Sequence, residues 1–178
     1  LEMKIANGYK IEGYFPTPAE TVQDMLDAAD IQPGQTLLEP SAGSGAIAGA
    51  ATERGAVVTC IEQNSQLCEL LRLKGLGVIH GDFTAEQIDQ TFDAVVMNPP
   101  FEKGQDVEHV TRALGYVKRG GSLVAIMSPA FQYRQQAKWT AFRDMLDGLD
   151  HDITTLPAGT FKESGTNVET VMITIRKQ

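Results

Sequence analysis

The stretch FDAVVMNPPF, residues 92–101, determines how this chain can fold. Its apolar run, Ala94–Met97, is typical of a buried parallel strand. The two prolines that follow have no N–H group, so they cannot continue a strand ladder, and the first of them restricts Asn98 to an extended backbone. The strand is therefore predicted to end at Asn98, in a stiff turn beside the ring of Phe101. In open α/β sheets, ligands bind at this end of the strands.

The turn after this strand has two interpretations. An asparagine side chain and a prolyl carbonyl can both accept hydrogen bonds from one NH2 group, and Phe101 can stack on a planar base or amide. Alternatively, the prolines only close the strand and Phe101 joins the core. The turn alone does not decide between them, so the rest of the chain must.

Strand and helix patterns alternate on both sides of this stretch. Strands are expected at 36–39, 56–62, 76–80, 92–98, 122–127, 152–156 and 167–175. Helices are expected at 19–29, 46–53, 65–73, 84–90, 107–117 and 138–146. Thr17 is the expected N-cap of the first helix, with Pro18 at its first position, and Gly120-Gly121 is an expected turn. This alternation predicts an α/β fold with a mostly parallel sheet, helices on both faces and an antiparallel hairpin at one edge.

Composition excludes several classes of protein. The 178 residues are most simply one domain, and 42% hydrophobic residues fit a globular protein. No apolar run approaches the ~20 residues of a membrane span, and no signal peptide is evident. Two cysteines favour a reduced, cytoplasmic protein, and no Cys/His spacing predicts a metal site. We therefore expect a cytoplasmic protein without membrane or metal.

The charge is unevenly distributed. The net charge is −8, which argues weakly against a nucleic-acid partner. Residues 100–143, however, carry seven Lys or Arg and three acids, a balance of +4 that leaves −12 for the remainder. This segment is either a local basic face or an ordinary solvated helical surface.

A glycine-rich turn follows the first expected strand. Gly43-Ser44-Gly45 lies between strand and helix, where glycines allow a ligand to approach the backbone and the helix N-terminus favours polar or anionic groups. With Glu62 about 20 residues further on, it also matches the dinucleotide pattern G-x-G-x-x-A. The turn alone does not separate a nicotinamide cofactor from S-adenosylmethionine, and a tight structural turn is the alternative.

Acidic residues end three successive strands. Glu39 precedes the glycine turn, where a carboxylate would repel a pyrophosphate but could face the cationic methionine part of S-adenosylmethionine. Glu62 can accept hydrogen bonds from ribose hydroxyls. Asp82 can contact an adenine amine, and Phe83 can pack on its ring. The three acids are expected in a line at one edge of the sheet.

These motifs resemble a known family. Residues 39–45 (EPSAGSG) and 98–101 (NPPF) resemble the two signature motifs of class I S-adenosylmethionine-dependent amino-methyltransferases. Residues 13–18 (GYFPTP) look like the N-terminal cofactor-binding motif of adenine-N6 DNA methyltransferases, including type I modification subunits. Residues 161–168 look like the late loop that helps to hold a flipped base. The resemblance implies a Rossmann-like fold with a seven-stranded sheet, in one domain over residues 1–178 whose residues 1–30 cover the cofactor.

The residue patterns and the resemblance together assign residues to three roles. Those expected at the S-adenosylmethionine cofactor are Phe15, Pro16, Thr17, Glu39, Ser41, Gly43, Gly45, Glu62, Asp82, Phe83 and Asn98. Those expected at the methylated amine are Asn98, Pro99, Pro100 and Phe101. Those expected at the remainder of the substrate are Phe101, Lys103, Arg134, Lys138, Phe161 and Lys162, with the cations contacting phosphates.

The function implied is methyl transfer to the exocyclic N6 amine of adenine in DNA, with the base flipped out of the stack. No stretch has room for a separate target-recognition region, and the short candidates are 101–106, 130–137 and 157–167. Recognition is therefore minimal, supplied by a protein partner, or directed at a substrate other than DNA. The alternatives are an RNA or protein-glutamine methyltransferase, a non-catalytic subunit of a modification complex, and a nicotinamide oxidoreductase.

Overall fold

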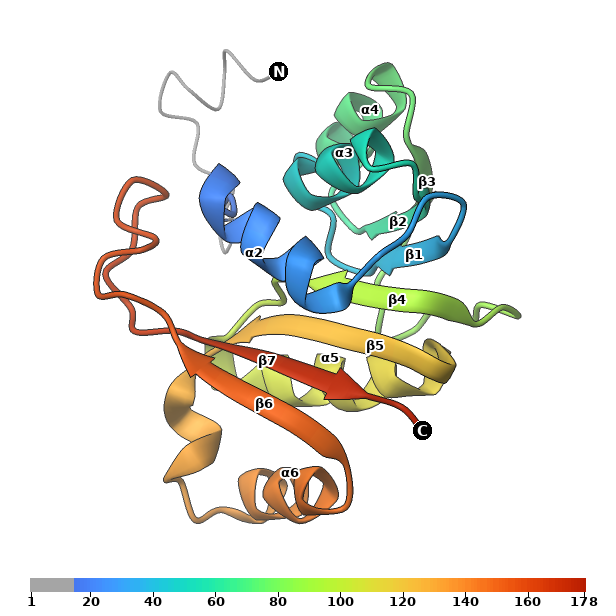
Figure 1. Cartoon of the computed structure of the whole chain (residues 1–178). Helices are drawn as coiled ribbons and strands as arrows, with labels where there is room; N and C mark the ends of the chain where they lie inside the picture. The colour runs from blue at the N-terminus through green and yellow to red at the C-terminus, as the bar shows by residue number, and fades with distance from the viewer. Residues whose placement is uncertain (1–14) are drawn as a thin grey trace.

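The computed structural model describes residues 15–178 (Figure 1). Residues 1–14, including Gly13 and Tyr14 of the expected N-terminal motif, lie outside the described part. The chain forms a seven-stranded sheet in the order β3-β2-β1-β4-β5-β7-β6. The strands are β1 (Thr36–Glu39), β2 (Val57–Glu62), β3 (Gly77–His80), β4 (Phe92–Met97), β5 (Val117–Met127), β6 (Asp150–Thr155) and β7 (Val171–Arg176).

Strand direction in this sheet follows the prediction. The first five strands pair in parallel, and β7 runs antiparallel between β5 and β6. The predicted C-terminal hairpin at one edge is therefore confirmed, as is the mostly parallel seven-stranded sheet. The inner parallel strands β1 and β4 are buried on both faces, which explains their apolar runs, and parallel strands need a crossover connection to return.

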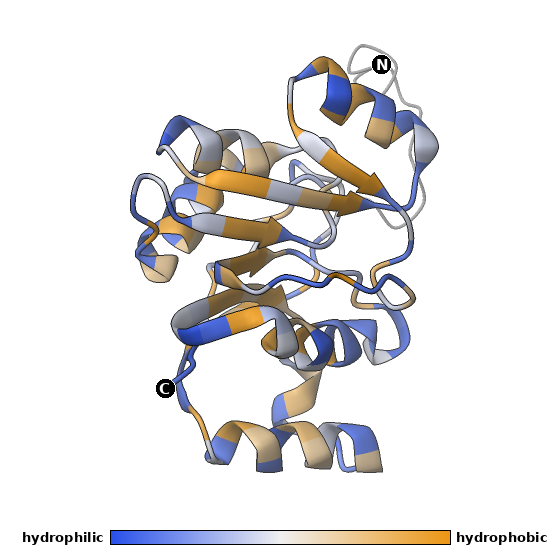
Figure 2. Cartoon of the chain, turned by 90° about the vertical axis from the view of Figure 1, so that its right-hand side faces the viewer, coloured by the Kyte–Doolittle hydropathy of each residue, from blue (hydrophilic) through white to orange (hydrophobic). Residues whose placement is uncertain are grey.

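Helices cover both faces of the sheet. They are α2 (Ala19–Ala29), α3 (Ala46–Glu53), α4 (Ser65–Leu73), α5 (Gln105–Ala113) and α6 (Ala137–Asp147), with short 3-10 turns η1 (Glu102–Gly104), η2 (Leu114–Tyr116) and η3 (Pro129–Gln132). Buried residues of α2 and α3 pack on one face, and those of α5 and α6 pack on the other. In Figure 2 the central strands are mostly hydrophobic, whereas the helices mix hydrophilic and hydrophobic residues.

The predicted helix over residues 84–90 is wrong. The segment is a turn in which the Asp82 carboxylate accepts hydrogen bonds from the N–H and hydroxyl of Thr84. The Arg112 guanidinium donates hydrogen bonds to the carbonyl oxygens of Phe83 and Glu86. In a helix these carbonyls would accept from backbone N–H groups instead. A cation from α5 therefore stabilises the non-helical path.

The predicted turn at Gly120-Gly121 lies inside a longer strand. β5 begins at Val117, and its pairing with β4 jumps from Phe92↔Val117 to Ala94↔Ser122. Gly120 has φ of 79°, and a Cβ atom on Gly121 would lie 2.5 Å from the Asp93 carbonyl oxygen. The glycines therefore form a bulge, a device that short-range sequence patterns do not separate from a turn.

Thr17 does not cap the first helix, so this prediction is also wrong. The carbonyl of Pro18 accepts the first helical hydrogen bond, from Val22 at 2.9 Å, which makes Pro18 the N-cap residue, and no side chain caps α2. The Thr17 hydroxyl has a different partner, described below.

Across residues 15–178, no helix is both long and apolar enough to cross a membrane. The same part of the chain contains no cluster of three or more His, Cys, Asp or Glu side chains suited to a metal ion.

Candidate active site

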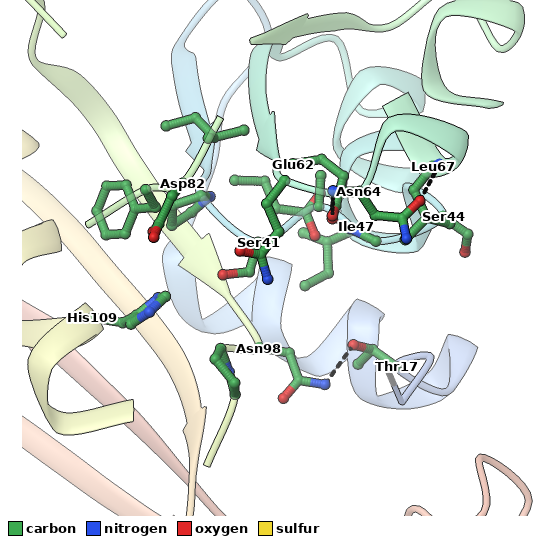
Figure 3. A pocket seen from close by; sticks show the side chains of 18 of the residues that line it. Thr17, Ser41, Ser44, Ile47, Glu62, Asn64, Leu67, Asp82, Asn98 and His109 are labelled. Carbon is green, nitrogen blue, oxygen red and sulfur yellow. Dashed lines mark hydrogen bonds between the residues drawn. The ribbon is translucent and has the colours of Figure 1, made fainter. Parts of the chain in front are cut away.

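Polar side chains line the carboxyl edge of the sheet in the order of the strands. Asp82 follows β3, Glu62 ends β2, Glu39 ends β1 and Asn98 follows β4, and these strands are neighbours in that order. The predicted line of acids is thus present. A cavity of about 580 Å³, the large cavity, opens along this line (Figure 3). Every residue expected at the cofactor lines it except Gly45.

The glycine turn is tied to the end of β2. Glu62 is 8% exposed, and its Oε2 accepts a hydrogen bond from the Gly43 N–H at 2.8 Å, while its Oε1 accepts one from the Asn64 N–H at 2.8 Å. The carboxylate thus holds the turn in place and still lines the large cavity. Asn64 in turn caps α4 by accepting hydrogen bonds from Gln66 and Leu67.

Gly45 serves packing rather than ligand approach. Its φ is 85°, and a Cβ atom there would lie 2.7 Å from Leu71 of α4. It lies outside the lining of the large cavity, so the structure does not place it with the other expected cofactor residues. Gly43, with φ of 54°, does line the cavity. Of the two glycines, only Gly43 therefore brings its backbone to the large cavity.

Glu39 is a buried carboxylate facing the large cavity. It is 2% exposed, and its Oε2 accepts a hydrogen bond from the Ala48 N–H at 2.9 Å, one of the free amides at the start of α3. Burial raises its pKa well above the usual range, and the nearby Glu62 raises it further. Among residues 15–178 no cation pairs with this carboxylate, so a positively charged ligand would stabilise it.

Asp82 and Phe83 differ strongly in exposure. Asp82 is exposed, and the hydrogen bonds from Thr84 lower its pKa, so it is ionised at neutral pH. Phe83 is 3% exposed, and its ring packs against His109 at 5.6 Å and against Tyr116 at 5.9 Å. Both residues line the large cavity, Asp82 with a charge and Phe83 with the small exposed part of its ring.

The Asn98 amide has a fixed orientation. Its Nδ2 donates to the Thr17 hydroxyl oxygen at 3.1 Å and to the Phe15 carbonyl at 3.5 Å. A backbone carbonyl can only accept, so the NH2 group must face Phe15 and Thr17 and the Oδ1 atom points away from them (Figure 3). An acceptor oxygen is therefore available at the end of β4.

A second, more apolar cavity of about 390 Å³, the small cavity, adjoins the same turn. All four residues expected at the methylated amine line it, and so does Phe161. Phe15, Asn98 and Pro100 line both cavities, so the turn forms their common boundary. Phe101 also packs against the core formed with α2 and α3, so the two interpretations of this ring are compatible.

The expected phosphate contacts lie outside both cavities, among the exposed side chains. Lys138 donates to the Lys103 carbonyl and pairs with Glu108 at 3.6 Å, and its Nζ lies 4.8 Å from the ring centre of Trp139. The Arg134 guanidinium lies 5.2 Å from the same ring. Two of the four cations, Arg134 and Lys138, therefore lie at Trp139. Lys103 lies in the η1 turn that follows Phe101, and Lys162 is on the late loop.

Sequence reasoning missed the contribution of α5 to the large cavity. Gln105, Glu108 and His109 line it from the helix that follows the Pro-Pro turn. Their spacings of i, i+3 and i+4 place them on one helical face, which was the available signal. This spacing does not say where the face points, because that depends on how α5 is oriented on the sheet.

The chain belongs to the methyltransferase small domain family, which matches its residues 22–146. Among curated proteins none matches this chain. The fold is shared with many solved structures, at identities that support the fold alone.

Three of these structures illustrate the similarity in fold. A type I restriction-modification methyltransferase subunit from Streptococcus thermophilus is 20% identical with a TM-score of 0.78, covering 92% of this chain and 45% of its own. A protein of Listeria monocytogenes described as a class I S-adenosylmethionine-dependent methyltransferase is 14% identical with a TM-score of 0.77, covering 99% and 65%. TrmN from Thermus thermophilus is 19% identical with a TM-score of 0.68, covering 90% and 49%. This chain therefore spans less than two thirds of each of them.

Family and fold together imply S-adenosylmethionine as the cofactor, and the large cavity suits it. Its volume is within the range of cofactor sites. The buried Glu39 carboxylate, whose pKa is raised by burial and by the nearby Glu62, matches a ligand that carries a positive charge. A pyrophosphate would be repelled by Glu39 and Glu62, which disfavours a nicotinamide dinucleotide at this place.

Proposed function

We propose that this protein transfers a methyl group from S-adenosylmethionine to the exocyclic N6 amine of adenine in DNA, with the base flipped out of its stack. The observation that carries the proposal is the orientation of Asn98 at the boundary of the two cavities. Its NH2 group is held by Thr17, so Oδ1 is left to accept from an amine in the small cavity. The family-level activity, methyl transfer, needs such a position between donor and acceptor.

In this reaction the main role of the protein is to position the amine. When bound, S-adenosylmethionine supplies a methyl group on a sulfonium centre. Asn98 Oδ1 and the Pro99 carbonyl accept hydrogen bonds from the amine, which draws its lone pair out of conjugation with the ring. As the nitrogen–carbon bond forms, the methyl–sulfur bond breaks, and the amine proton leaves to water. Holding the reacting atoms in this geometry removes much of the entropic barrier.

The small cavity supports a flat, largely apolar acceptor. Phe101 and Phe161 give it two aromatic walls, and Pro99 and Pro100 give it a rigid one. A flipped base is held by stacking in such a place, at about 1–3 kcal/mol per aromatic contact. The cofactor residues named above, with Gly45 set apart as a packing residue, would hold S-adenosylmethionine in the large cavity.

Recognition of a DNA site would rest on little of this chain. We propose that residues 1–178 form one methyltransferase domain, of which residues 1–30 cover the cofactor. The basic residues around Trp139 and Lys162 would contact phosphates, which fixes position without reading sequence. Sequence specificity would then be short or supplied by a protein partner.

The test is methylation of several acceptors with labelled S-adenosylmethionine. DNA, tRNA, rRNA and a release-factor-type protein are incubated with the parent and with Asn98→Ala, and labelled bases are mapped. We expect N6-methyladenine in DNA from the parent, at least a hundredfold less from Asn98→Ala, and binding of S-adenosylhomocysteine in both. Label in RNA or protein alone would replace the DNA assignment by one of those substrates.

A further inference from the structure

His109 carries a buried ring nitrogen without a partner. The residue lies on α5 and is 7% exposed, and its Nδ1 is enclosed with no hydrogen-bond partner among the residues described. The ring lines the large cavity, between Asp82 and Asn98 in Figure 3. Buried polar groups are nearly always satisfied, so an exception at a cavity requires an explanation. None of the roles assigned above uses this side chain.

The surroundings of His109 fix its protonation. Its ring packs against Phe83 at 5.6 Å and an interplanar angle of 53°. Burial lowers the pKa of His109, while Asp82 and Glu108 raise it and Arg112 lowers it, with burial the largest effect. The ring is therefore neutral at physiological pH and carries one N–H.

The single N–H belongs on Nε2. An enclosed N–H without an acceptor is rarer and costlier than a bare acceptor nitrogen, so the enclosed Nδ1 carries the lone pair. Because His109 lines the large cavity and Nδ1 is the enclosed nitrogen, we place Nε2 on the cavity side. His109 thus presents a hydrogen-bond donor to the cavity, near the acceptor oxygens of Asp82, and the unpaired Nδ1 is explained as the lone-pair nitrogen of this tautomer.

We propose that His109 donates from Nε2 to a ring nitrogen of the adenine of S-adenosylmethionine, beside Asp82, which accepts from the exocyclic amine of the same ring. This rests on the cofactor part of the proposed function and is independent of the methyl acceptor. Asp82 and His109 are close enough for the carboxylate to affect the pKa of the imidazole.

The pair matches the edge of adenine. Adenine presents an amine donor flanked by ring-nitrogen acceptors, which complements one acceptor and one donor. Hypoxanthine presents the reverse pattern, an oxygen acceptor beside an N–H donor. His109 is therefore a specificity-determining residue for the cofactor, with its ring held in place by Phe83.

The test measures binding of S-adenosylhomocysteine by calorimetry, without any methyl acceptor. Glutamine places its amide nitrogen near the position of Nε2, and asparagine places its own near Nδ1. We expect His109→Gln to bind within about threefold of the parent, and His109→Asn and His109→Phe to bind about tenfold more weakly. Phenylalanine keeps the ring packing on Phe83, and thermal unfolding confirms that the variants fold.

Analogues locate the hydrogen bond. Deaza analogues of S-adenosylhomocysteine lack N1 or N7, and we expect one of them to lose about tenfold in affinity for the parent and little for His109→Phe. We expect the parent to bind S-inosylhomocysteine more weakly than S-adenosylhomocysteine, and this difference in affinity to be smaller in His109→Phe.

Two results would overturn the proposal. One is equal affinity of the parent and His109→Phe for S-adenosylhomocysteine. The other is an equal loss for each analogue in both proteins, which would leave His109 as a packing residue only. A parent that binds no S-adenosylhomocysteine would overturn the cofactor assignment as well, whereas a failure to methylate DNA would count against the acceptor alone.

Discussion

At the scale of single residues, the orientation of Asn98 depends on a residue far away in the sequence. Thr17 accepts a hydrogen bond from its Nδ2 at 3.1 Å across a separation of 81 positions. Thr17 was expected to cap α2, and its hydroxyl instead accepts from the Asn98 amide, whose NH2 group also faces the Phe15 carbonyl. Residues outside the NPPF motif therefore hold the proposed acceptor atom of that motif in place.

Replacing Thr17 tests this control. Thr17→Val keeps the shape of the side chain and removes the hydroxyl, so the Asn98 amide can rotate and turn its NH2 group toward the substrate. We expect kcat for methylation to fall about tenfold with little change in KM for S-adenosylmethionine, because one hydrogen bond of about 1 kcal/mol is lost. Thr17→Ser, which keeps the hydroxyl, is the matched control and should retain most activity. A larger effect on KM than on kcat would assign Thr17 to cofactor binding instead.

At the scale of elements, one carboxylate joins three neighbouring strands at the edge opposite the site. Asp93, in β4, accepts hydrogen bonds from the N–H and hydroxyl of Thr36 in β1 and from Lys118 in β5. The hydrogen bond from the Thr36 backbone is the largest cause of its lowered pKa, and Lys118 lowers it further. This contact fixes the relative positions of the strands whose other ends carry Glu39 and Asn98.

The stability carried by Asp93 should depend on pH. Because its pKa is lower in the folded than in the unfolded chain, its contribution is complete above the unfolded pKa of about 4 and is lost as the pH falls through the folded pKa. We expect Asp93→Ala to lower the free energy of unfolding by about 2 kcal/mol at pH 7 in urea titrations. The difference from the parent should shrink as the pH falls below about 4.

Asp93→Asn is the control for this prediction. It keeps one acceptor oxygen for the Thr36 backbone N–H and loses the charge facing Lys118, so it should be less destabilising than alanine. A difference between the parent and Asp93→Ala that is the same at pH 3 and pH 7 would contradict the role of the ionised carboxylate.

At the scale of the whole molecule, the charges are separated. The chain carries −8, yet cations gather around Trp139 and the late loop, at the edge of the sheet that holds both cavities. An acidic protein can bind a polyanion only where such a local excess lies, which makes the binding weak and sensitive to salt.

The salt dependence of DNA binding should report these cations. Changing Lys103, Arg134 and Lys162 to glutamine should reduce the slope of log K against log salt by about 3 for duplex DNA, because each phosphate contact contributes about 0.9. Arg54→Gln and Arg119→Gln, at the opposite edge of the sheet, are matched controls and should leave the slope unchanged. An unaltered slope in the triple variant would place the DNA elsewhere on the surface.

The sequence by itself determined the fold and much of the lining of the large cavity. Apolar runs, glycine and proline turns and strand-ending acids each depend on nearest neighbours, and they gave the order of elements and the line Asp82, Glu62, Glu39 and Asn98 at one edge. It failed where distant groups compete with local preference. Arg112 donates to a carbonyl at the start of the predicted helix over residues 84–90, and the Thr17 hydroxyl binds the Asn98 amide instead of capping α2.

Only the tertiary structure decided how the amide and the cavities are arranged. Local pattern identifies an Asn-Pro-Pro turn, but the direction of its amide depends on partners more than 80 residues away. The direction of α5, and with it the place of His109, depends on how that helix packs across the sheet. The physical reason is that a motif fixes backbone path, whereas the state of a side chain is set by every group that reaches it in space.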